Sequence, residues 1–158
     1  MTTTKRLGFI GLGVMGEPIC RNILKAGLGS MRVFDKNPEA VARLIADGAT
    51  AAASVAELAE GSDILFLSLP GGPEVEAVVT GDGGILSSAD DELVIVDLST
   101  CPVRLTRRVH EEAARRNVAF LDAPVARTRQ AAIDGTLSIM VDATETEFEM
   151  IRPFLVPA

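Results

Sequence analysis

Three glycines near the start of the chain, Gly11, Gly13 and Gly16, have the spacing G-x-G-x-x-G. The first glycine of such a motif permits a tight turn, the second lets the backbone approach a pyrophosphate, and the third lets a helix pack closely on a strand. Asp35 follows at about 20 residues' distance, where a carboxylate can accept hydrogen bonds from ribose hydroxyls. The pattern therefore predicts a dinucleotide site, with the phosphates at a helix N-terminus.

The apolar residues around these glycines predict the elements that such a site requires. Residues 6–13 are typical of a buried strand that runs into a turn, and residues 14–26 have the periodicity of an amphipathic helix. Residues 31–35 predict a second strand, which ends at Asp35. A glycine motif is weak on its own, and the strand, turn and helix around it make this one specific.

The rest of the chain alternates short apolar runs with amphipathic ones. Strands are expected over residues 63–70, 92–99, 118–124 and 137–143, and helices over 38–46, 54–61, 102–116 and 145–155, with one more starting near 73. Strands that alternate with helices form a parallel sheet through right-handed crossovers. The sequence thus predicts an α/β fold, a Rossmann-type doubly wound and mostly parallel sheet, with residues 1–158 as one dinucleotide-binding domain.

The composition argues against several classes of function. The chain carries 22 acidic against 15 basic residues, and its net charge of −7 leaves no basic surplus for contacts with nucleic-acid phosphates. No apolar run reaches the roughly 18 residues of a membrane span. Cys20 and Cys101 are expected to be reduced thiols, and a single histidine, His110, does not make a metal site. We expect a cytoplasmic protein that binds no nucleic acid, no membrane and no metal ion.

Four motifs resemble those of one family. The segment GFIGLGVMGEPICRNILKAG is similar to the N-terminal signature of the β-hydroxyacid dehydrogenases, which include 3-hydroxyisobutyrate dehydrogenase and tartronate semialdehyde reductase, with 6-phosphogluconate dehydrogenase as a more distant relative. SLPGGPEV, IVDLST and DAPVARTRQAAIDGTLSIMV resemble later motifs of the family, in the family's order. The resemblance extends from Leu7 to about Leu155 and implies the same fold.

The resemblance also implies which residues bind the cofactor, and that the cofactor is NAD. Together with the glycine motif and the residue after Asp35, it predicts a cofactor site made of Gly11, Leu12, Gly13, Val14, Met15, Gly16, Asp35, Lys36, Leu69, Pro70, Glu74 and Thr100. Thr100 would approach the nicotinamide end. Asp35 favours NAD over NADP because a carboxylate repels a 2′-phosphate, although Lys36 beside it would soften that repulsion.

The segment that the resemblance gives to the substrate departs from the family. After DAPV the family has Ser-Gly-Gly, whereas this chain has Ala126, Arg127 and Thr128. Ala126 has no hydroxyl to offer a substrate carboxylate. Arg127 or Arg129 can pair with a carboxylate through a bidentate fork, or both are solvated surface residues. The sequence leaves these two interpretations open.

The family's proton-transferring lysine lies in a helical C-terminal domain, which we expect to be absent from this chain. The lysines here are Lys5, Lys25 and Lys36, so no catalytic residue is predicted within these 158 residues. We expect the cofactor domain of an oxidoreductase that transfers a hydride between a small, 3-hydroxyisobutyrate-like β-hydroxyacid and NAD. This domain alone would be inactive. Together with the C-terminal domain, we expect it to form a homo-oligomer. The alternative is a non-catalytic nucleotide-binding or interaction module.

A domain separated from such a partner is expected to expose an apolar patch. We predict this patch around Met150, Phe154, Leu155 and Val156, near the end of the last helix.

Overall fold

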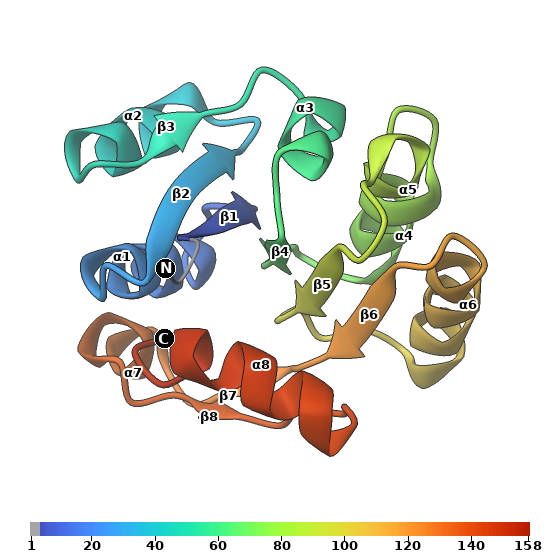
Figure 1. Cartoon of the computed structure of the whole chain (residues 1–158). Coiled ribbons are helices and arrows are strands. Elements are labelled where there is room, and N and C mark those ends of the chain that lie inside the picture. The colour runs from blue at the N-terminus through green and yellow to red at the C-terminus, as the bar shows by residue number, and fades with distance from the viewer. Residues whose placement is uncertain (1–3) are drawn as a thin grey trace.

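Six parallel strands form the central sheet of the computed structural model, which describes residues 4–158 (Figure 1). The strands are β1 (Lys5–Ile10), β2 (Gly29–Phe34), β3 (Thr50–Ala51), β4 (Ile64–Leu67), β5 (Val94–Asp97) and β6 (Ala119–Asp122). Their order across the sheet is β3-β2-β1-β4-β5-β6, and each pairing between them is parallel. This strand order is that of the doubly wound Rossmann fold and confirms the predicted fold class.

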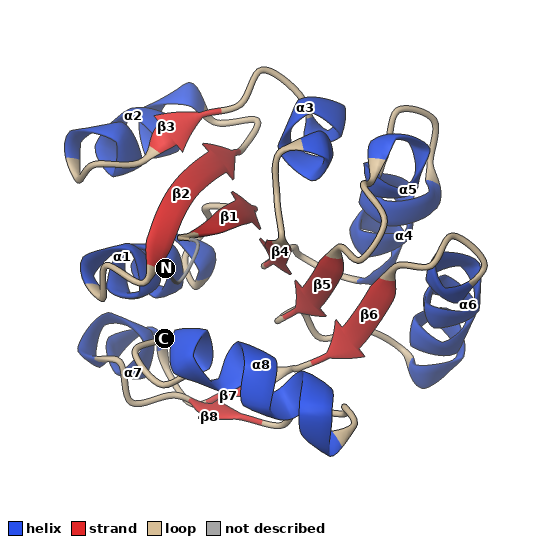
Figure 2. Ribbon diagram, viewed as in Figure 1, coloured by secondary structure: helices blue, strands red, loops and turns tan. Residues whose placement is uncertain are grey.

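Helices cover both faces of this sheet (Figure 2). Those between its strands are α1 (Gly16–Lys25), α2 (Pro38–Ala46), α3 (Val55–Glu60), α4 (Gly72–Thr80), α5 (Ile85–Ser88) and α6 (Val103–Ala114). One core contains Ile19 of α1 and Phe66 of β4, and the core on the other face contains Val75 of α4 and Leu65 of β4. Strand β4 contributes to both cores because successive side chains of a strand point to opposite faces.

The sheet extends from β1 in two directions, and this arrangement creates a crevice. The chain leaves β1 for α1 on one face, whereas it leaves β4 for α4 on the other face. Between these diverging connections lies the switch point of the topology, at the carboxyl ends of the strands. Ligands of open α/β sheets bind at such points.

The strand predicted over residues 137–143 is only partly present, and it lies outside the central sheet. The extended part of this segment is β8 (Ser138–Ile139), which pairs antiparallel with β7 (Val125–Ala126) in a separate two-stranded sheet. A single bridge between Asp122 and Asp142 connects this small sheet to the end of β6. The alternation of side chains identifies an extended segment but does not identify its partner strand.

The last helix, α8 (Glu145–Leu155), has the predicted bounds, but the apolar patch predicted on it is only partly present. Phe154 and Leu155 are 6% and 8% exposed, because they pack into the core that also contains α1. Met150 and Val156 are exposed, at 38% and 68%. Two of the four residues predicted to form the patch are thus buried in the core.

Candidate functional site

The turn between β1 and α1 has a backbone that two of the motif's glycines make possible. Gly11 has a φ of +95°, and a Cβ there would overlap the carbonyl oxygen of Ser68. A Cβ on Gly16 would overlap the carbonyl oxygen of Gly11. Larger residues at either position would push the turn away from the end of β4. The turn can therefore lie directly against the strand ends.

Gly13 differs from these two glycines because the position of its missing side chain faces open space. Among the described residues other than Gly13 and its two chain neighbours, no atom lies within 4 Å of the position that a Cβ on Gly13 would occupy. The fold itself thus tolerates a side chain here. The missing side chain leaves the backbone open to a ligand, which is what a pyrophosphate at the start of α1 requires.

The first turn of α1 carries a negative charge that two arginines compensate. Arg43 forms a bidentate ion pair with Glu17, with N–O distances of 2.9 and 2.8 Å, and Arg21 donates to the same carboxylate at 3.0 Å. These hydrogen bonds, those of Arg43 first, hold the pKa of Glu17 below its ordinary value although burial opposes them. The arginines also connect α1 to α2, since Arg43 lies on α2.

Asp35 lies directly after β2, as predicted, and its carboxylate is held by the backbone. One oxygen accepts from the N–H of Leu12 at 2.6 Å, and the other accepts from the N–H of Asn37 at 2.7 Å. The side chain of Asn37 in turn caps α2 by accepting from the N–H of Glu39. The carboxylate is thus fixed in place, and each of its oxygens keeps a lone pair for a further donor.

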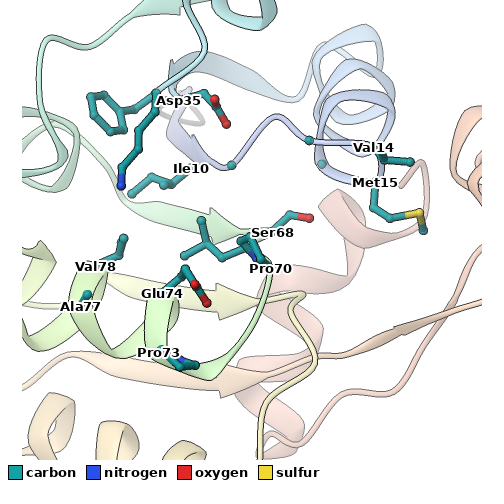
Figure 3. A pocket seen from close by; sticks show the side chains of 16 residues that line it. Ile10, Val14, Met15, Asp35, Ser68, Pro70, Pro73, Glu74, Ala77 and Val78 are labelled. Atoms are coloured by element: carbon teal, nitrogen blue, oxygen red, sulfur yellow. The ribbon is translucent and has the colours of Figure 1, made fainter.

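A cavity of about 650 Å³ joins these groups, a size within the roughly 300–1,000 Å³ of small-molecule sites. Its lining consists of Ile10, Gly11, Gly13, Val14, Met15, Gly16, Phe34, Asp35, Lys36, Ser68, Leu69, Pro70, Pro73, Glu74, Ala77 and Val78. Figure 3 shows Asp35 and Glu74 on different sides of the cavity, with Val14 and Met15 at the glycine turn. All the residues predicted to bind the cofactor lie here except Leu12 and Thr100.

Leu12 and Thr100 lie outside the lining for different reasons. The side chain of Leu12 is 3% exposed and packs into the core, so only its backbone N–H faces Asp35. Thr100 is exposed in the loop between β5 and α6. Its neighbour Cys101 is half-buried, and burial together with Asp97 raises the pKa of that thiol to about 12.

The segment predicted to bind the substrate begins with the last residue of β7 and lies on the surface, outside the cavity. Ala126, Arg127 and Thr128 are all exposed, and the hydroxyl of Thr128 caps α7 (Arg129–Asp134) by accepting from the N–H of Ala131 at 3.3 Å. Arg127 has a φ of +95°, in the left-handed region that favours glycine. This residue stands where the resembled family has a glycine, and its backbone has a conformation suited to glycine.

His110 has a structural partner that the sequence analysis does not predict. Its Nδ1 lies 3.1 Å from the carbonyl oxygen of Phe120, on the edge strand β6. The residue also borders a second cavity of about 430 Å³ between α6 and the start of α8. Within residues 4–158, no group of three or more histidine, cysteine, aspartate or glutamate side chains is arranged to hold a metal ion. Over the same residues, no helix has the length and apolar character to cross a membrane.

The sheet order, the glycine turn and the fixed aspartate after β2 define a dinucleotide-binding domain of the Rossmann class. A family model described as the NAD binding domain of 6-phosphogluconate dehydrogenase matches residues 6–157, and the chain belongs to this family.

Two of the relatives are named as dehydrogenases. The chain is 41% identical to 2-(hydroxymethyl)glutarate dehydrogenase of Eubacterium barkeri, over 98% of its own length and 51% of that protein. The structure of Mycobacterium tuberculosis 3-hydroxyisobutyrate dehydrogenase with L-serine superposes with a TM-score of 0.90, at 32% identity, over 98% of this chain and 52% of that one. The chain therefore spans about half the length of the relatives it matches.

The structure of a third relative contains a bound cofactor. Psf3, solved in complex with NADP+ and 2-OPP, is 30% identical and superposes with a TM-score of 0.89, over 96% of this chain and 53% of that one. The family thus shows that the domain binds NAD or NADP and does not distinguish between the two.

Proposed function

We propose that this chain is the cofactor-binding part of an oxidoreductase that transfers a hydride between NAD and a small β-hydroxyacid. The observation that carries the proposal is the open backbone at Gly13 beside the fixed carboxylate of Asp35, both on one cavity. A bound nicotinamide cofactor would supply the hydride chemistry. The chain itself would bind and orient it.

The residues of the cavity divide this work between them. Gly13 and the start of α1 would receive the pyrophosphate, where free N–H groups and the helix dipole favour an anion. Asp35 would accept hydrogen bonds from the adenosine ribose. Leu69 and Pro70 would border the nicotinamide half, and Thr100 would lie at its far end. Gly13, Asp35, Leu69 and Pro70 all line one cavity, which supports this arrangement.

The charge of Asp35 supports NAD over NADP. A 2′-phosphate on the adenosine ribose would lie close to this carboxylate and be repelled, whereas a 2′-hydroxyl would donate to it. Lys36 on the same cavity reduces this repulsion without removing it.

We extend the proposal to the substrate. A small hydroxyacid would bind beside Ala126, Arg127 and Thr128, with its carboxylate on Arg127. The guanidinium is exposed, and among the ion pairs of the described residues none includes it, so it is available for a carboxylate. The hydroxyacid names of the relatives also support this substrate class.

Titration of the chain with NADH and with NADPH, followed by calorimetry, tests the proposal. We expect saturable binding of NADH and weaker binding of NADPH. Absence of saturable binding of either would contradict the proposal. A preference for NADPH would contradict only the argument from Asp35.

A non-catalytic nucleotide-binding module is the second candidate. It is favoured by Ala126, which has no hydroxyl to offer a substrate at the position where the resembled family has a serine. The two candidates differ in turnover. NADH production from a panel of β-hydroxyacids, by this chain and by the product of its complete reading frame, separates them. For the catalytic candidate we also propose a cytoplasmic homo-oligomer.

A further inference from the structure

The loop after β4 and the loop after β5 are joined by a hydrogen bond to the buried Ser99, which is in turn bonded to Asp97. The hydroxyl of Ser99 accepts from the backbone N–H of Leu69 at 2.9 Å. The backbone N–H of Ser99 donates to the carboxylate of Asp97 at 3.0 Å. Asp97 is 0% exposed and Ser99 4%, so water does not compete for these bonds. We call Asp97, Ser99 and Leu69 the loop clasp.

Burial of the Asp97 carboxylate is energetically unfavourable, because no cation accompanies it. Among the ion pairs of residues 4–158, none includes this carboxylate. Its second oxygen lies 3.6 Å from the thiol sulfur of Cys101, and the nearby charged group is Asp122 at the end of β6, which carries the same sign. Burial accordingly raises the pKa of Asp97. An apolar side chain would fill this position at lower cost, so packing alone does not explain an aspartate.

The loop clasp lies at the edge of the cavity and connects the loops that follow β4 and β5. Leu69 borders the cavity, so the Ser99 hydroxyl fixes one wall of that cavity. Thr100 lies between Ser99 and Cys101, and both of these neighbours bond to Asp97. One carboxylate therefore determines where the loop after β5 lies relative to the loop after β4.

We propose that Asp97 is a positioning residue that sets the nicotinamide end of the cofactor site. It acts through Ser99 and Cys101, which place Thr100 opposite Leu69. This inference rests on the proposed function, in which the adenosine half binds at Asp35 and the nicotinamide half lies between these two loops. The clasp then affects the second half of the dinucleotide and leaves the first half unaffected.

A comparison of two ligands tests this division. NADH occupies both halves of the site, whereas ADP occupies only the adenosine half. For the variants Asp97→Ala and Ser99→Ala we expect the Kd for NADH to rise about tenfold, since the N–H of Ser99 or of Leu69 loses its acceptor. The Kd for ADP is expected to change by less than about twofold. Calorimetric titration of the chain with each ligand measures both constants.

Ser62→Ala is the matched control. Ser62 is also buried, at 1% exposure, and its hydroxyl donates to the carbonyl oxygen of Leu58 at 2.6 Å, beyond the amino end of β4. It should lower the unfolding temperature and leave the ratio of the two Kd values unchanged. Should Asp97→Ala not fold, Ser99→Ala decides alone, since it removes only the hydrogen bond from Leu69.

The outcomes separate the clasp from the proposed function. Selective loss of NADH affinity in the clasp variants supports the inference. Equal loss of both affinities, or an unchanged ratio as in Ser62→Ala, overturns it while the proposed function stands. A wild-type chain that binds neither ligand overturns the proposed function, and the inference with it.

Discussion

The carboxylate of Asp35 accepts a hydrogen bond of 2.6 Å from the backbone N–H of Leu12. This bond connects the end of β2 to the glycine turn that follows β1, and so fixes the group expected to bind ribose relative to the turn expected to bind pyrophosphate. The two residues are 23 positions apart in the chain. Their contact is the geometrical basis for the predictions on cofactor binding.

Replacing Asp35 by alanine should weaken binding of NADH about tenfold and narrow the preference over NADPH, because both the ribose acceptor and the repulsion of a 2′-phosphate disappear. The free energy of unfolding should also fall by about 1 kcal/mol, since the N–H of Leu12 loses its acceptor. Titrations with both cofactors and urea denaturation measure these effects. An unchanged preference would contradict the role given to Asp35.

Gly13→Val and Gly16→Val form a matched pair. A side chain on Gly13 enters empty space, so this variant should fold normally and lose NADH binding. A side chain on Gly16 overlaps the carbonyl oxygen of Gly11, so this variant should unfold at a clearly lower temperature. Circular dichroism melts and NADH titrations check both outcomes. Retention of tight NADH binding by Gly13→Val would show that the backbone there does not receive the pyrophosphate.

Arg127→Gly should stabilise the chain by about 1 kcal/mol, because a φ of +95° costs an arginine free energy that glycine does not lose. Arg129→Gly is the control, since Arg129 begins α7 and glycine there should destabilise the helix. Urea denaturation of the two variants measures the difference. Destabilisation by Arg127→Gly would mean that contacts of the side chain outweigh the backbone strain.

The ion pairs of Glu17 predict a loss of stability at acidic pH. Arg43 and Arg21 lower the pKa of Glu17 in the folded chain. The contribution of Glu17 to the free energy of unfolding is therefore fully present at pH values above the pKa that Glu17 has in the unfolded chain. The contribution is lost as the pH falls through the lower pKa of the folded chain. Glu17→Gln should therefore cost about 1 kcal/mol at pH 7 and progressively less in acid. Urea denaturation from pH 3 to pH 7 tests this, and a pH-independent difference would contradict it.

The sequence alone determined the doubly wound sheet and most of the residues on its cavity. The spacing of Gly11, Gly13 and Gly16 follows from backbone requirements that are local, and Asp35 has to end a strand whose apolar pattern is visible. The buried run of β4 and the bounds of α8 were predictable for the same reason, since long periodic segments indicate an element without reference to its neighbours.

Tertiary structure decided which distant groups meet. The antiparallel pairing of β7 with β8, the burial of Phe154 and Leu155, and the hydrogen bond from Leu69 to Ser99 each join segments whose local patterns do not name a partner. Strands of two residues, such as β3 and β8, are also too short to show an alternation. Periodicity tells which face of an element is apolar, whereas the choice of partner depends on the packing of the whole chain.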